Sequence, residues 1–205
     1  MSKSALLVMD VQQGIVGRFT GEDTGYLSRV GRAIDGARAA GLPVLYVVVG
    51  FRAGHPEISA RNKTFGAIAS AVRSGAEQSS AGQSGGAAAG GFADGDPHAE
   101  IHPDVAPRPG DVVVTKKRVS AFAGSDLDMV LRAGDIDSLV LTGIATSGVV
   151  LSTLRQAADL DFGLTVLEDG CLDADPEVHR VLTEKVFPRQ AEVVTVDKWV
   201  ASLGS

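Results

Sequence analysis

Two ionisable side chains follow apolar stretches of this sequence and are candidates for acid–base chemistry. Asp10 comes directly after four apolar residues, and Lys116 follows the run Val-Val-Val-Thr. A carboxyl group at the end of a buried strand is only partly solvated, so it is held either protonated or paired with a cation. Lys116 is the natural partner. Each residue also has an ordinary interpretation, because an Asp after a strand commonly caps a helix and a Lys in a Lys-Lys-Arg cluster is commonly solvated.

A third candidate is the small-residue turn Thr-Gly-Ile-Ala-Thr-Ser-Gly-Val-Val at residues 142–150. Backbone N–H groups at the start of a helix have no intrahelical partner, so a strand-to-helix turn of this kind can bind an anion or an oxyanion. Taken alone, the turn is better explained as a tight strand-to-helix connection that needs small residues.

These groups lie in an alternation of short apolar runs and helical segments. Expected strands cover residues 5–11, 43–49, 111–115, 138–142, 164–167 and 192–196, and expected helices cover residues 26–40, 126–133, 147–160 and 176–186. Short, continuously apolar strands separated by helices indicate a parallel sheet covered on both faces. We therefore predict a three-layer α/β/α fold with a mostly parallel, Rossmann-like doubly wound sheet of about six strands. Sites in such sheets form beyond the carboxyl ends of the strands.

The length of 205 residues predicts one domain, residues 1–205, with an insertion at about 74–95. Seventeen of the 22 residues in that segment are Gly, Ala or Ser, a composition typical of a flexible connection. A domain boundary is the alternative, but the α/β pattern continues across it. The loop is either a solvated excursion or a lid over a site.

Composition excludes several classes of function. The net charge is −6 without a clustered Lys/Arg stripe, which argues against nucleic acid, and the apolar runs are too short to span a membrane. The single cysteine and the absence of a charged-then-apolar leader predict a cytoplasmic protein.

The ordered combination of motifs resembles the isochorismatase-like hydrolases, a superfamily of cysteine hydrolases that includes nicotinamidases, N-carbamoylsarcosine amidases and isochorismatases. Its motifs here are Leu-Leu-Val-Met-Asp-Val-Gln around Asp10, Ile-His-Pro-Asp-Val-Ala-Pro from Ile101, Lys-Lys-Arg-Val-Ser-Ala-Phe from Lys116, Thr-Gly-Ile-Ala-Thr from Thr142, and Asp-Gly-Cys ending at Cys171, with Asp-Pro-Glu and His179 downstream. The resemblance covers nearly the whole chain outside the insertion, and it implies the same parallel fold.

For the site, the resemblance implies a catalytic pair of Asp10 and Lys116. In the amidase branch two residues separate Gly-Val-Ala-Thr from a cysteine nucleophile, and a cis peptide precedes the Ala. Carried over, the cis bond lies between Ile144 and Ala145, and the N–H groups of Ala145 and Val149 form the oxyanion cradle.

The nucleophile position itself holds Val149, which neither attacks a carbonyl nor exchanges a proton. Cys171 is expected to be a small buried residue in the segment after the fifth strand. Ser147, Ser152 and Thr146 are nearby hydroxyls, but no histidine or second base accompanies them in the sequence.

Candidate substrate-binding residues are Gln12, Arg52, Arg61, Phe122 and Thr146. The guanidinium groups of the two arginines match carboxylate geometry, although a surface arginine is the simpler interpretation of each. Metal-binding relatives carry an Asp-x-His pair after the second strand, which residues 50–56 lack, so we predict no metal and no cofactor.

Two hypotheses remain open. One is a hydrolase without a thiol, in which Asp10 is a general acid or base beside Lys116 and cleaves a vinyl ether, as isochorismatases do, or a C–N bond. The turn lacks the aromatic residue of isochorismatases, so the reaction is not assigned. The other is a catalytically silent member that binds a small ligand or serves as an interaction protein. The resemblance also implies a homodimer or homotetramer.

Overall fold

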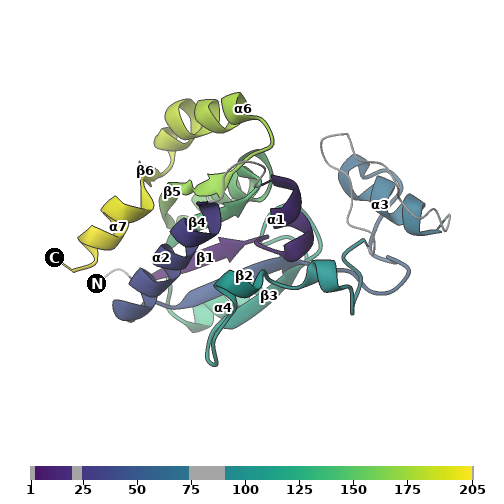
Figure 1. Ribbon diagram of the computed structural model, residues 1–205, viewed down its shortest axis with the longest axis horizontal. Helices are drawn as coiled ribbons and strands as arrows, with labels where there is room; N and C mark the ends of the chain where they lie inside the picture. Colours follow the sequence, from purple (N-terminus) through teal and green to yellow (C-terminus); the bar gives the residue numbers. More distant parts are fainter. Residues whose placement is uncertain (1–2, 20–24, 74–90, 205) are drawn as a thin grey trace.

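A computed structural model of the protein describes residues 3–19, 25–73 and 91–204. Six parallel strands form one sheet in the order β3-β2-β1-β4-β5-β6 (Figure 1). The predicted three-layer class, with a doubly wound parallel sheet of six strands, is confirmed. The strands are β1 Ser4–Met9, β2 Val44–Val49, β3 Val112–Lys116, β4 Ser138–Ile144, β5 Gly163–Leu172 and β6 Glu192–Val194.

Helices cover both faces of the sheet. They are α1 Gln13–Phe19, α2 Tyr26–Ala39, α3 Lys63–Arg73, α4 Leu127–Ala133, α5 Leu151–Asp159, α6 Pro176–Val181 and α7 Val196–Ser202. A helical turn, Thr146–Val150, precedes α5, and another, Leu182–Val186, follows α6. Figure 1 shows α2 and α7 together on one face, whereas α3 stands apart from the sheet.

Alternate residues of β1 point to opposite faces and so divide the core in two. Leu7 and Met9 pack with α4 and α5, while Leu6 and Val8 pack with α2 and α7. Because both faces of β1 are buried, its sequence is continuously apolar, which is the pattern that predicted a parallel sheet. This central position places the end of β1, and with it Asp10, in the middle of the carboxyl edge.

Some elements differ from expectation. Helices α1, α3 and α7 were not predicted. Helix α1 is short and contains two glycines. Helix α7 begins at Val196 and is capped by Thr195, whose hydroxyl accepts the N–H of Lys198, a cap that the sequence does indicate. β5 runs to Leu172 rather than 167, because its pairing with β4 shifts register after Leu141 and then resumes.

Most of the predicted insertion, residues 74–90, lies outside the described residues. Its last part, from Gly91, packs on the body of the protein: the Phe92 side chain is buried, and Phe51 donates its backbone N–H to the Phe92 carbonyl over 2.9 Å. The single-domain assignment stays a prediction. Among the described residues no helix is long and apolar enough to span a membrane.

Gly143 lets β1 and β4 approach each other at the edge that carries the candidate site. Its φ is +148°, and a Cβ at this position would lie 2.3 Å from the backbone oxygen of Met9. Both constraints concern backbone atoms, which a rotamer change does not relieve. Gly143 is therefore required by the closeness of the strands.

Gly143→Ala is expected to destabilise the protein by about 3 kcal/mol, because the methyl group must push apart two central strands. Urea unfolding followed by circular dichroism measures the change. Gly31→Ala is the matched control, since a Cβ there meets nothing within 4 Å and the residue lies inside α2. That control should be neutral or gain up to about 1 kcal/mol. Equal stability of the Gly143→Ala variant and the wild type would contradict the argument.

Candidate functional site

Asp10 and Lys116 form a buried ion pair at the carboxyl edge of the sheet. Lys116 is the last residue of β3, and its Nζ lies 3.0 Å from Oδ2 of Asp10, across the intervening β2. The two side chains are 2% and 9% exposed, respectively. Lys116 Nζ also donates to the carbonyl of Arg118 over 3.0 Å. The predicted partnership of these residues is thus present in the structure.

Burial and a neighbouring charge act in opposite directions on the pKa of the Asp10 carboxyl group. Burial raises its pKa, and the nearby Lys116 ammonium, which acts in the opposite direction, offsets this only in part. Oδ1 of Asp10 is buried and has no hydrogen-bond partner among the described residues. One oxygen of the carboxyl group is therefore held by the ammonium, and the other is left for a further partner.

The turn after β4 lies beside Asp10. Met9 is paired with Gly143 in the β1–β4 register, so Asp10, the first residue after β1, comes next to Ile144, the last residue of β4. The Ile144–Ala145 peptide bond is cis, at the place that the resemblance implies. The Ala145 carbonyl accepts the N–H groups of Gly148 and Val150 over 3.0 and 3.3 Å.

The turn is not a regular helix start. Gly148 has φ −96° and ψ −105°, which kinks the Thr146–Val150 turn before α5. Ser147 donates its N–H to the Asp173 carboxylate over 2.7 Å, so this particular N–H is already satisfied by the protein. The expected helix over residues 147–160 therefore begins as a kinked turn, and α5 proper begins at Leu151.

Val149 is a core side chain. It is 2% exposed and belongs to the apolar cluster that includes Ala121, Phe122 and Val150. The isopropyl group of Val149 fills space in the core and carries no acidic, basic or nucleophilic atom.

Thr146 has a histidine partner that the sequence analysis missed. Its Oγ1 lies 2.8 Å from Nδ1 of His179, which comes from α6 33 residues later. The expectation that no histidine accompanies the hydroxyls of the turn was wrong, because α6 folds back over the turn. His179 was noticed only as part of a motif, and its spacing carries no signal of this contact.

Cys171 lies within β5 rather than after it, and it is buried. Burial raises the pKa of its thiol to about 12, so the thiolate is scarce at neutral pH. Its Sγ faces the Leu141 carbonyl at 3.9 Å. These features agree with the structural role expected for this cysteine.

The predicted substrate-binding residues have unlike surroundings. The Gln12 amide is occupied by backbone: it donates to the carbonyls of Val49 and Ala99 and accepts the Val49 N–H. Phe122 is buried against Phe162. Arg52 pairs with Glu57 and is 69% exposed.

Arg61 is exposed. Neither arginine is shown beside the Asp10 carboxyl group, and their binding roles remain predictions.

His55, His98 and His102 each have separate partners. His55 is buried against Phe51, with Nε2 2.9 Å from the Gly91 carbonyl, while His98 pairs with Asp96 and His102 lies near Asp104. In the described ranges no three His, Cys, Asp or Glu side chains are grouped to hold a metal.

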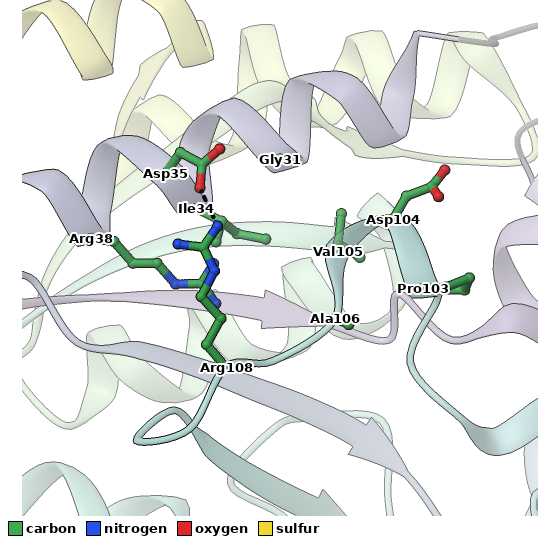
Figure 2. Close-up of a pocket in the computed structure, with 9 residues that line it drawn as sticks. All are labelled: Gly31, Ile34, Asp35, Arg38, Pro103, Asp104, Val105, Ala106 and Arg108. Carbon is green, nitrogen blue, oxygen red and sulfur yellow. Dashed lines mark hydrogen bonds and ion pairs between the residues drawn. The ribbon is translucent and has the colours of Figure 1, made fainter.

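A polar cavity of about 220 Å³ lies elsewhere, between α2 and residues 103–108 (Figure 2). Figure 2 shows the guanidinium groups of Arg38 and Arg108 close together, with Asp35 reaching Arg108. Arg38 is paired with Asp111. The cavity contains none of the predicted site residues, and its charges already compensate one another, so we place the candidate site at Asp10.

Replacing only one member of the buried Asp10–Lys116 pair is expected to lower the free energy of unfolding more than its share of the loss when both are replaced. Asp10→Asn and Lys116→Met should each lower the free energy of unfolding by about 3 kcal/mol, because each leaves an uncompensated buried group, and the double variant should lose less than the sum. A urea-unfolding double-mutant cycle measures the coupling. The control is the exposed pair Arg32–Asp197, for which a coupling near zero is expected. Additive losses at Asp10 and Lys116 would contradict the pairing.

Comparisons with known proteins identify the family of the chain. A family model described as an isochorismatase domain matches residues 4–198. The ureidoacrylate amidohydrolase RutB of Stutzerimonas stutzeri is 30% identical over 98% of this chain and 80% of its own length. The uncharacterized isochorismatase family protein YecD of Escherichia coli O157:H7 is 31% identical over 98% and 96%.

Among solved structures, N-carbamoylsarcosine amidase from Thermoplasma acidophilum superposes with a TM-score of 0.70 and 27% identity, covering 95% of this chain and 97% of that one. The match to the family model extends over almost all of the sequence and takes in every residue of the Asp10 site. The chain belongs to the isochorismatase family of hydrolases.

Proposed function

We propose that this protein hydrolyses a small molecule without a cysteine nucleophile, with Asp10 as the general acid or base and Lys116 as its partner. The observation that carries the proposal is the pairing of Lys116 with one oxygen of Asp10 while the other, Oδ1, has no partner among the described residues. A free oxygen on a carboxyl group of raised pKa can hold or release the proton that a hydrolysis moves.

For a C–N bond, Oδ1 of Asp10 takes a proton from water while the water oxygen forms a bond to the carbonyl carbon. The same proton then passes to the leaving nitrogen as the C–N bond breaks, which returns Asp10 to its starting state. Lys116 keeps the carboxylate oriented throughout. The names of two relatives, a ureidoacrylate amidohydrolase and an N-carbamoylsarcosine amidase, favour this class of bond.

For a vinyl ether, protonated Asp10 delivers its proton to the alkene carbon, and water adds to the resulting oxocarbenium carbon. The hemiketal then breaks its C–O bond to give an alcohol and a ketone, and the proton released returns to Asp10. The raised pKa of Asp10 supports this class, because a general acid must carry its proton near the working pH.

Val149 supports the absence of a covalent step in both cases. By the resemblance of its motifs, Val149 is expected at the position where the amidase branch has its nucleophile, and its isopropyl group forms no bond to substrate. The nucleophile in the proposed reaction is therefore water rather than a thiol. The alternative, a silent ligand-binding member, is an outcome of the tests that follow.

Asp10→Asn is expected to lower kcat/KM by at least about 10²-fold on any substrate found in a screen of small amides, ureido compounds and vinyl ethers. The pH profile distinguishes the two roles. If Asp10 is the base, kcat/KM rises with pH through its raised pKa, and if it is the acid, kcat/KM falls there. Asp197→Asn, which changes an exposed carboxylate, is the control and should leave turnover unchanged. Full activity of Asp10→Asn, or no turnover by the wild type, contradicts the proposal; the latter outcome favours a binding protein.

Val149→Cys is expected to create amidase activity that iodoacetamide abolishes, because the new thiol would take the position that the resemblance gives to the amidase nucleophile. The variant is made in a Cys171→Ala background, so that alkylation reports on one thiol. Val149→Ala is the matched control, since it removes the isopropyl group without adding a nucleophile. A Val149→Cys variant that is inert across the amide panel would show that this pocket is not an amidase pocket lacking only its nucleophile.

A further inference from the structure

Two contacts from one segment hold the turn beside Asp10. The segment, residues 173–179, runs from the end of β5 into α6. Its first residue, Asp173, accepts the Ser147 N–H over 2.7 Å, and its last, His179, contacts the Thr146 hydroxyl at 2.8 Å. The turn's own backbone hydrogen bonds converge on the Ala145 carbonyl. The Asp173 and His179 side chains connect the turn to the segment that follows β5.

The Thr146–His179 contact is sensitive to the proton state of the ring. Thr146 is fully buried, so its hydroxyl proton needs an acceptor within the protein. A neutral ring with its proton on Nε2 supplies that acceptor at Nδ1. A protonated ring carries a hydrogen on Nδ1 as well, so the hydroxyl must turn away and lose its acceptor.

We propose that His179 is a positioning residue: its neutral ring accepts the Thr146 hydroxyl and fixes the turn next to Asp10, and protonation of the ring reverses this bond and loosens the turn. The inference rests on the proposed function, because the turn matters for turnover only if Asp10 acts on a substrate there. Its structural content, the tautomer and the titration, can be measured without any substrate.

The surroundings of the ring favour the neutral form at physiological pH. Burial lowers the pKa of His179, and the carboxylates of Asp173 on the segment and Glu168 on β5 act in the opposite direction with less effect. On its own helix and the turn that follows, Glu177 and Glu184 are paired with Arg180. Stability from this bond is fully present above the pKa of the ring in the unfolded chain, about 6.5, and is lost as the pH falls from there through the lowered pKa of the folded protein.

The first test uses nuclear magnetic resonance on the wild-type chain. Ring nitrogen shifts should show the Nε2–H tautomer, a pKa below the ordinary value of about 6.5, and amide shifts of residues 146–150 that follow the same titration. Thr146→Val should move the His179 pKa upward, because the bond that stabilises the neutral ring is gone. An Nδ1–H tautomer would overturn the inference, and so would amide shifts of residues 146–150 that do not change as the His179 ring titrates.

The second test uses turnover, if the screen finds a substrate. The His179→Asn side chain retains a hydrogen-bond acceptor but does not titrate, so the variant should keep activity at neutral pH. Its kcat should fall less at acidic pH than that of the wild type, because protonation of His179 no longer contributes to the fall. His179→Leu should lower kcat about tenfold with little change in KM, and His98→Leu, at a half-exposed histidine, should change neither. An unchanged acid limb in His179→Asn would overturn the positioning role. A wild type without turnover contradicts the proposed function, and the ring measurements then decide the inference by themselves.

Discussion

The Asp10–Lys116 ion pair requires three neighbouring parallel strands to end at the same level. Asp10 follows β1 and Lys116 ends β3, so the 3.0 Å contact spans the strand between them. Both groups are almost removed from water, where an unpaired charge is costly, so each depends on the position of the other. Strand register, the two apolar layers and the close approach at Gly143 all serve to keep these ends aligned.

On the other side of β1, the same edge is completed by the turn after β4. The β1–β4 register places Ile144 next to Asp10, and the turn then kinks at Gly148 and continues into α5. Asp173 and His179 hold this turn from the β5–α6 side. The carboxyl group, the ammonium and the turn therefore come from different strands, and only a doubly wound parallel sheet brings their ends together.

Much of this organisation was accessible from the sequence, for reasons visible in particular residues. Leu6 to Met9 are apolar without alternation because both faces of β1 are covered, and this pattern correctly predicted a parallel sheet. The positions of Asp10, Lys116 and the 142–150 turn at strand ends were predicted in the same way. By contrast, β5 was predicted too short because a register shift is a property of strand pairing, and α1 was missed because its glycines weaken the helical pattern.

The sequence by itself determined the types of group available: one carboxyl and one ammonium after buried strands, a valine in the turn, and a single cysteine. These follow from residue identity and local order, which need no coordinates. The tertiary structure decided which groups meet. It paired Lys116 with one oxygen of Asp10, buried Cys171 so deeply that its pKa rises to about 12, and brought His179 to Thr146. Burial and contact depend on how segments that are distant in the sequence pack together, so they cannot be inferred from the order of neighbouring residues.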